Sequence, residues 1–239
     1  LSPRIIEYGG SRFLICGGFY RKEDRVKGEL HLQRMMIGEL KSPTAFKTGM
    51  TVIAQPTQTW EGTGKVQILE GPFPLYAPGG TLYIAYAAGE TSGNEYCTGL
   101  LKFTGTENDK LTDRSKWQKL NDPLQFMDYD NKVYSPGAMV FVRDPAGETL
   151  WGIFHVKYYP NVGYNHRILY AMPVTFEGEL PKMGAPEQPD VTYQMTVNPM
   201  PINDRIFGFT TVNTVTPSPD PFPETTANPA DTDPADEII

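Results

Sequence analysis

The chain is poor in the residues that hold disulfide scaffolds and metal centres together. It contains 2 cysteines and 3 histidines among 239 residues. Two cysteines do not define a disulfide framework, and these two do not stand at a spacing typical of metal ligands. Cys16 and Cys97 each lie inside or beside an apolar run. We therefore expect both to be small buried hydrophobic residues.

The sequence is also short of positive charge and of long apolar runs. Lys and Arg number 21 against 28 Asp and Glu, which gives a formal net charge of -7. Nucleic-acid binding needs a basic surface, so we expect no nucleic-acid partner. No stretch approaches the roughly 20 apolar residues of a membrane-spanning helix, and no signal peptide is visible, so we expect no membrane partner.

Residues that favour turns and strands are, in contrast, plentiful. The chain has 23 Gly, 22 Pro, 13 Tyr and 12 Phe. This mixture favours a turn-rich, all-β protein over a helical one. The last part of the chain differs, because beyond Pro217 it carries acidic residues and many prolines but no Lys or Arg. We expect residues 214–239 to form a disordered, acidic, Pro-rich tail.

One pattern of strand, glycine-containing turn and apolar strand occurs three times. The three segments are residues 7–19, 75–89 and 142–158. Their turn glycines, Gly10, Gly80 and Gly147, recur at intervals of about 70 residues, and each hairpin is followed by another strand-like run. Units of about four strands without helical periodicity are typical of β-propeller blades.

The repeat length predicts about three blades before the tail, whereas propellers typically need at least four to close. Either residues 190–213 add a partial blade, or further blades precede Leu1. We favour the second interpretation because Leu1 begins almost at the first strand of a repeat. The prediction is therefore a partial β-propeller domain over residues 1–213.

Glu70 stands between the apolar run "VQIL" and the turn-forming "GPFPLY", at the predicted start of an inner strand. In a propeller such strand starts surround the central channel. General acid catalysis of glycoside cleavage uses a carboxyl group that an apolar surround keeps protonated, with a second carboxylate as base or nucleophile. Glu70 is thus a candidate general acid. The alternative is a polar strand end bonded to a turn.

The order of several motifs resembles glycoside hydrolase family 43. "ILEGPFPLY", followed by "GGTLYIAYAA", resembles the family's "NEGP" segment, whose Glu is the general acid, and the strand after it. Upstream "LHLQRMMIGELKSPTAF" and downstream "DRSKWQKLNDPLQF", "YSPGAMVFVRDPAGETLWGIFHV" and "HRILYAMPVTFEGELPKMGAPE" are similar to family segments in the same order. The resemblance covers residues 1–186. It implies a five-bladed propeller, of which this chain would supply about three blades.

The resemblance also implies a function. Members of this family hydrolyse O-glycosyl bonds by an inverting acid-base mechanism, with α-L-arabinofuranosyl or β-D-xylosyl substrates from plant polysaccharides. The expected partners are therefore carbohydrates, namely arabinan, arabinoxylan or xylan fragments. Secretion to the extracellular space is expected on the same ground. No cofactor is expected, and calcium stays open without support from this sequence.

Residues of the site follow from the same resemblance. The general acid of the family falls on Glu70, an arginine of the last blade on Arg167, and a strand-end histidine on His155. Arg167 would bond a sugar or form a salt bridge within its strand. His155 would bind substrate or be a satisfied core histidine, and it is a poor metal signal, so no metal site is expected. Trp60 and Phe73 could stack on sugar rings or fill the space between blades.

Three departures from the family pattern bear on activity. Ser2 stands where the family has an Asp that supports the acid and orients substrate, and Ala138 replaces a channel histidine. The general base of the family lies in an earlier blade, before Leu1, while Asp128 and Asp130 are either substitutes for it or turn formers. Ser2 is kept as a substrate-binding candidate. The alternatives to an enzyme are a catalytically degenerate propeller that binds glycan and a protein-binding propeller without a sugar site.

Overall fold

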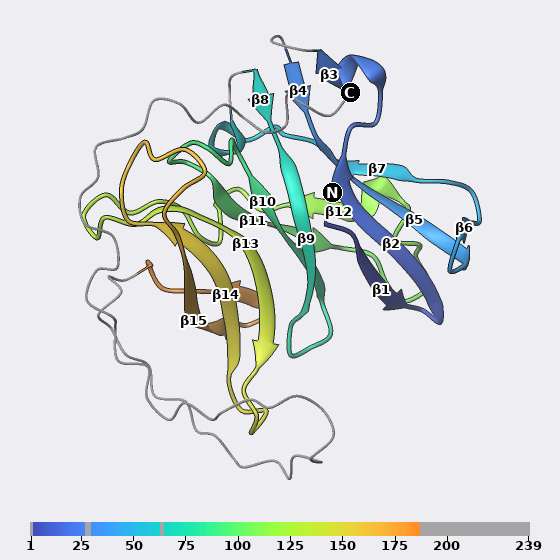
Figure 1. Ribbon diagram of the computed structural model, residues 1–239. Helices are drawn as coiled ribbons and strands as arrows, with labels where there is room; N and C mark the ends of the chain where they lie inside the picture. Colours follow the sequence, from blue (N-terminus) through green and yellow to red (C-terminus); the bar gives the residue numbers. More distant parts are fainter. Residues whose placement is uncertain (1, 27–29, 63–64, 187–239) are drawn as a thin grey trace, which may run out of the picture.

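The computed structural model describes residues 2–26, 30–62 and 65–186, and these form an all-β structure (Figure 1). Its regular helices are short 3-10 turns, Lys22–Asp24 (η1), Thr59–Glu61 (η2) and Arg114–Lys116 (η3). The side chain of Asp113 accepts a hydrogen bond from the Ser115 backbone N–H at the start of η3. The predicted tail and the suggested partial blade at residues 190–213 lie outside the described residues.

Three antiparallel sheets follow one another along the chain, and we call them blades one, two and three. Blade one contains β1 (Arg4–Tyr8), β2 (Ser11–Gly18), β5 (Arg34–Ser42), β6 (Ala45–Phe46) and β7 (Thr51–Ala54). Blade two contains β9 (Leu69–Tyr76), β10 (Leu82–Ala88), β11 (Cys97–Phe103) and β12 (Trp117–Lys119). Blade three contains β13 (Tyr134–Arg143), β14 (Leu150–Lys157), β15 (Arg167–Glu177) and β16 (Leu180–Lys182).

A small accessory sheet joins blades one and two. It consists of β3 (Arg25–Val26), β4 (Leu30–Leu32) and β8 (Val66–Gln67), and β4 and β8 pair in parallel. The blades, drawn side by side in Figure 1, are the arrangement of a partial β-propeller. The predicted fold class and the count of about three blades are confirmed.

The three predicted hairpins form at their turn glycines. They connect β1 to β2, β9 to β10 and β13 to β14. Gly10, Gly80 and Gly147 have φ angles of 72°, 92° and 75°. Residues with a Cβ are strained in this left-handed region, which explains why glycine recurs with the period of the blades.

Strand β10 shows why the hairpin strands are continuously apolar. All 7 of its residues are buried. Leu82, Ile84 and Tyr86 belong to the cluster between blades one and two, while Tyr83 and Ala85 belong to the cluster between blades two and three. Successive side chains of a strand point to opposite faces, so a strand covered on both faces needs apolar residues at every position.

Both cysteines are buried and free, as predicted. Burial raises the pKa of Cys16 and, much further, that of Cys97. The thiol of Cys97 donates weak hydrogen bonds to the carbonyls of Trp60 and Ala88, at 3.6 and 3.7 Å. These thiols are therefore packing groups of the core rather than nucleophiles.

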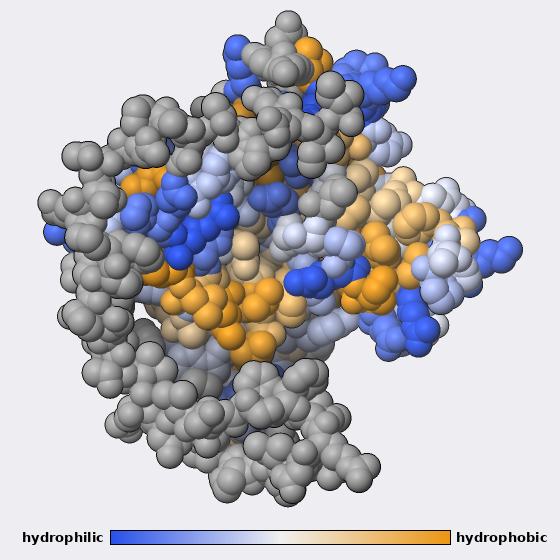
Figure 2. Space-filling model, in the orientation of Figure 1, coloured by the Kyte–Doolittle hydropathy of each residue, from blue (hydrophilic) through white to orange (hydrophobic). Residues whose placement is uncertain are grey.

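Blades two and three contact each other through β13, which packs on β9, β10 and β11, and through the loop after β10. The first residues of β9 pair with the end of β10, and the loop after β10 is bonded to the end of β14. Figure 2, in the orientation of Figure 1, shows apolar residues gathered over the lower part of these strands and hydrophilic residues above them.

Candidate active site

Glu70 is the second residue of β9 and is half-buried. The pairing of β9 with β10 shifts register next to it, between Ala85 and Ala87, and Gly71 in this bulge has a φ of 57°. A bulge bends its strand and changes the direction of the adjoining side chains. The local sequence Glu-Gly-Pro therefore interrupts regular pairing where the carboxylate stands.

Two hydroxyl groups donate hydrogen bonds to one oxygen of Glu70. The Tyr96 hydroxyl lies 2.8 Å from Oε1, and the Thr91 hydroxyl lies 3.3 Å from the same atom. Tyr96 immediately precedes β11, and Thr91 lies in the loop between β10 and β11. These hydrogen bonds fix the orientation of the carboxylate, and neither of them involves Oε2.

Tyr96 is itself rigidly packed. It is 2% exposed, and its ring stacks on the ring of His155 with a centroid distance of 5.6 Å and an interplanar angle of 16°. A Cβ at Gly137 would lie 2.4 Å from the Tyr96 ring, so only glycine fits there. Burial, with the negative charge of Glu70 and the hydrogen bond to it, raises the pKa of Tyr96 well above its ordinary value. Tyr96 is therefore a permanent donor to Glu70.

His155 lies on β14, opposite Gly137 of β13. Its Nε2 atom is buried and has no hydrogen-bond partner among the described residues. Burial lowers the pKa of His155 to about 4, and the positive charges of Arg167 and Lys157 add to this effect. The imidazole is therefore neutral near pH 7, and binding of a substrate by His155 stays a prediction.

Arg167 begins β15 and pairs with Lys157 of β14. Arg167 is an exposed residue, and its guanidinium carbon lies 5.6 Å from the centre of the Tyr164 ring. The charge of Arg167 lowers the pKa of both His155 and Tyr96, which places it in the same neighbourhood. The structure thus gathers Glu70, His155 and Arg167 around Tyr96, three residues that the sequence had nominated.

Three further residues of this neighbourhood were not found from the sequence. Tyr96 and Thr91 contact Glu70 directly, and Lys157 is a fully buried lysine whose Nζ binds the loop that carries Thr91. Tyr96 and Thr91 stand in a polar loop without any motif. Lys157 could have been noticed in the sequence, because it is a cation inside the largely apolar run "WGIFHVKYY".

The other nominated residues lie elsewhere. The indole N–H of Trp60 donates to the carbonyl of Asn121 at 2.8 Å, and its ring stacks on Tyr86 in the cluster between blades one and two. Phe73 packs in the other cluster, edge-on to Phe141. These contacts are those of residues that fill the space between blades. A role of either aromatic in sugar binding stays a prediction.

Ser2 and Ala138, which stand at two of the three departures from the family pattern, are both exposed. Ser2 precedes β1 and has a φ of 28°, and Ala138 lies in β13 with a φ of 57°. The pairing of β13 with β14 is irregular around Ala138, as that of β9 is beside Glu70. Contact of Ser2 with a substrate stays a prediction.

Glu61 is a second carboxylate of this region and is 0% exposed. Its Oε2 accepts hydrogen bonds from the backbone N–H groups of Thr57 and Gln58 and forms a 2.7 Å ion pair with Lys119. Its Oε1 accepts a 2.8 Å hydrogen bond from Tyr86. Both oxygens are thus used within the fold, and this carboxylate is a structural group.

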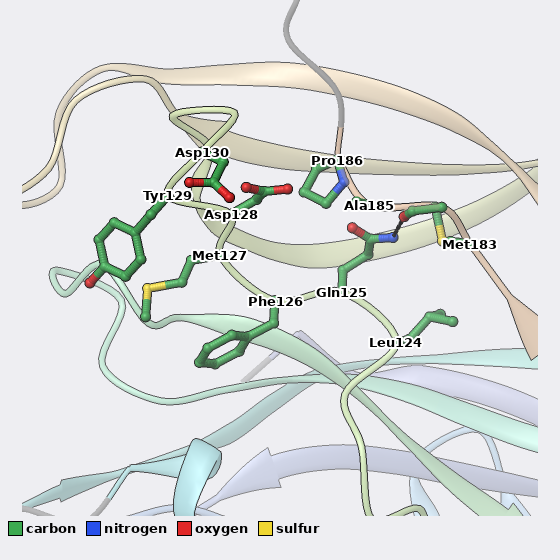
Figure 3. Close-up of a pocket in the computed structure, with 11 residues that line it drawn as sticks. Leu124, Gln125, Phe126, Met127, Asp128, Tyr129, Asp130, Met183, Ala185 and Pro186 are labelled. Atoms are coloured by element: carbon green, nitrogen blue, oxygen red, sulfur yellow. Dashed lines mark hydrogen bonds between the residues drawn. The ribbon is translucent and has the colours of Figure 1, made fainter.

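Asp128 and Asp130 line a separate pocket of about 450 Å³ between residues 124–130 and 183–186 (Figure 3). Asp128 accepts hydrogen bonds from the backbone N–H and the side-chain amide of Asn131, at 3.0 and 2.9 Å. These bonds lower the pKa of Asp128. Asp128 therefore has the contacts of a turn former, which is one of the two roles that the sequence left open.

Within the described ranges, the chain has neither a metal-ligand cluster nor a membrane-spanning helix. In residues 2–26, 30–62 and 65–186, no group of three or more His, Cys, Asp or Glu could hold a metal ion. Within the same ranges, no helix has the length and apolar character needed to cross a membrane.

Comparison with known proteins identifies the family. The family model described as "Glycosyl hydrolases family 43" matches residues 2–181. The chain belongs to this family. Glu70 with its neighbours Tyr96, His155 and Arg167 lies within the matched region, so the cluster is part of a glycosidase fold.

Solved structures of family members share the fold. An α-L-arabinofuranosidase from Lactobacillus brevis aligns with a TM-score of 0.69 and 23% identity, over 80% of this chain and 57% of that one. A thermostable family-43 glycoside hydrolase aligns with the same TM-score and 20% identity, over 82% of this chain and 61% of that one. These likenesses support the propeller fold.

A curated relative adds a sequence match. An extracellular exo-α-(1→5)-L-arabinofuranosidase from Streptomyces avermitilis is 27% identical over 128 residues, which is 54% of this chain and 26% of the relative. The chain therefore spans about a quarter of that relative and less than two thirds of the two solved structures.

Proposed function

We propose that this chain is part of an inverting glycoside hydrolase in which Glu70 is the general acid. Its substrates are arabinofuranosyl or xylosyl linkages of plant polysaccharides, and its site of action is extracellular, as for the relative from Streptomyces avermitilis. In this reaction Glu70 gives its proton to the glycosidic oxygen while that oxygen separates from the anomeric carbon. A second carboxylate, assigned to no residue of this chain, deprotonates the attacking water on the opposite face.

The observation that carries this proposal is the arrangement of the Glu70 carboxylate. Tyr96 and Thr91 donate to Oε1, so the carboxyl group is oriented while its other oxygen is available for proton transfer. The neutral ring of His155 and the exposed cation of Arg167 lie around the same tyrosine. Such groups suit recognition of sugar hydroxyls beside the acid.

A binding protein without hydrolysis is the second candidate. It is favoured by Ser2 and Ala138, which stand where the resemblance places a carboxylate and an imidazole and which are both exposed. In this case the Glu70 cluster would hold a glycan through hydrogen bonds but would release no product.

The experiment compares the full-length protein with its Glu70→Gln variant on arabino- and xylo-oligosaccharides. General acid catalysis is worth about 100- to 10,000-fold, so hydrolysis by the variant should fall by that factor. The same change at Glu148, an exposed residue of the β13–β14 turn at the far end of blade three, is the matched control and should leave the rate unchanged.

Equal rates for wild type and the Glu70→Gln variant would remove Glu70 from the mechanism. Calorimetric binding of the same oligosaccharides by wild type, without product on long incubation, would instead establish the binding protein. A protein that neither binds nor cleaves them would contradict both candidates.

A further inference from the structure

Lys157 is a buried cation for which the proposed reaction has no use. It is 0% exposed, and no carboxylate of the described residues lies within salt-bridge distance of its Nζ. Burial lowers its pKa to about 8, with Arg167 acting in the same direction and Glu90 opposing it. The side chain is therefore mostly an ammonium near pH 7. A buried charge is retained only where its hydrogen bonds are satisfied.

Three backbone carbonyls satisfy this ammonium. Nζ donates to the carbonyl oxygens of Thr91, Ser92 and Gly93, at 2.8, 3.2 and 3.1 Å. An ammonium has three N–H donors, so the number of acceptors matches the number of donors. All three carbonyls belong to the loop between β10 and β11 of blade two, whereas Lys157 ends β14 of blade three.

Other residues of blade three bind the same loop. The Ser135 hydroxyl donates to the carbonyl of Gly93 at 2.5 Å, and the Ser135 N–H donates to the carbonyl of Asn94 at 2.8 Å. Asn161 exchanges hydrogen bonds with the side chain of Asn94. The loop is thus docked on the neighbouring blade through polar contacts, three of which come from the Lys157 ammonium.

This loop carries the groups that orient Glu70. Thr91, whose carbonyl binds Lys157, donates its own hydroxyl to Oε1 of Glu70, and the loop leads directly into Tyr96. The path from Nζ to the carboxylate passes through one residue, Thr91. A displacement of the loop would therefore displace a donor of the carboxylate.

We propose that Lys157 is a positioning residue for the general acid. By binding three carbonyls of residues 91–93 across the blade interface, it holds Thr91 and Tyr96 against Oε1 of Glu70 and directs Oε2 to the glycosidic oxygen. The proposal rests on the proposed function of Glu70. Lys157 does not touch the substrate in this scheme.

The test uses two leaving groups with the full-length protein and its Lys157→Met variant. A sugar alkoxide, as in arabinobiose or xylobiose, leaves only when it is protonated, whereas a nitrophenolate leaves without much help. A misplaced acid should lower kcat on the disaccharide by about 10- to 100-fold with KM nearly unchanged. Hydrolysis of the matching nitrophenyl glycoside should fall several-fold less. A loss of folded protein alone would lower both rates equally.

Lys119→Met is the matched control. Lys119 is also a largely buried lysine, but it lies in blade two and binds Glu61 rather than residues 91–93. It should lower both rates by one factor. Thr91→Val tests the same path without disturbing Lys157, and it should lower the disaccharide rate selectively. Its effect should be much smaller in the Lys157→Met background, because coupled residues are not additive.

Three results would overturn the inference. The first is a Lys157→Met variant whose ratio of disaccharide to nitrophenyl glycoside rates is unchanged. The second is a Thr91→Val variant whose disaccharide rate equals that of wild type. The third is a double variant whose loss of disaccharide rate is the product of the two single losses. If Glu70→Gln is inactive on the disaccharide while Lys157→Met is like wild type, only this inference fails. If Glu70→Gln is fully active, the proposed function fails as well.

Discussion

Glu61 and Glu70 belong to the same part of the chain, and each accepts a hydrogen bond from a tyrosine, yet their surroundings differ. Glu61 is completely buried, and its two oxygens are occupied by Tyr86, Lys119 and two backbone N–H groups. Glu70 is half-buried, and both of its hydroxyl donors, Tyr96 and Thr91, bind one oxygen.

The difference separates a structural carboxylate from one suited to chemistry. A cation and hydrogen bonds on both oxygens compensate the charge of Glu61. Glu61 thereby joins η2 to β12, and neither of its oxygens is open to a substrate. Glu70 is oriented by neutral donors and is paired with no cation in the described residues. To act as an acid, a carboxyl group needs a fixed orientation and one oxygen that is not occupied by other groups of the protein.

Substitution of Glu61 should have the largest effect on stability. Glu61→Gln leaves Lys119 buried without its partner charge, and breaking a buried pair in this way costs about 3–5 kcal/mol. Urea unfolding should show this loss, while Glu70→Gln should change the free energy of unfolding by less than about 1 kcal/mol. The comparison breaks down if the two variants are destabilised equally.

The two tyrosines allow a matched pair of substitutions. Tyr96→Phe removes a donor to Glu70, and since hydrogen bonds to charged groups are worth about 1.5–3 kcal/mol, disaccharide hydrolysis should fall about 10- to 100-fold. Tyr86→Phe removes the corresponding donor to Glu61 and should lower the free energy of unfolding by about 1.5–3 kcal/mol without changing the rate per folded molecule. Hydrolysis rates and urea unfolding curves of both variants test whether Tyr96→Phe mainly lowers the rate and Tyr86→Phe mainly lowers the stability. The same profile for both would contradict it.

Stability should depend on His155 between about pH 6.5 and 4. Burial lowers the pKa of His155 from 6.5 to about 4, so in this range the unfolded chain binds a proton that the folded protein does not. The contribution of His155 is therefore lost as pH falls, by about 2 kcal/mol once partial solvent exposure is allowed for. His155→Gln should be less sensitive to acid than wild type when unfolding at pH 7 is compared with pH 4.5. An identical pH dependence would show that the histidine is solvated.

A third glutamate should give the smallest effect. Glu39 accepts hydrogen bonds from Lys47 and Ser11, which lower its pKa, but the side chain of Lys47 is 50% exposed. Ion pairs open to solvent contribute about 0–1 kcal/mol, so Lys47→Met should shift the unfolding midpoint only slightly. A loss as large as that of Glu61→Gln would show that the solvent exposure of the lysine is not what separates the Lys47–Glu39 ion pair from the Lys119–Glu61 ion pair.

Much of the fold could be predicted because its signals are local. The turn glycines at Gly10, Gly80 and Gly147 and the apolar strands after them indicated the blades, since a left-handed turn and two buried faces restrict the residue types that fit. Glu70 stood out for a similar reason, as a charge between an apolar run and a Gly-Pro pair. The sequence left two roles open for Trp60 and Phe73, because an aromatic side chain that packs between blades and one that stacks on a sugar have the same local pattern.

By itself, the sequence determined the all-β class, the succession of blades and the place of the candidate acid, because these depend on residues close together along the chain. Only the tertiary structure decided which groups orient that acid. Tyr96 and Thr91 reach Glu70 from the next strand connection, and Lys157 binds their loop from another blade. Contacts between such distant residues leave no periodic signal, since a hydrogen bond constrains two atoms in space and not the residues between them.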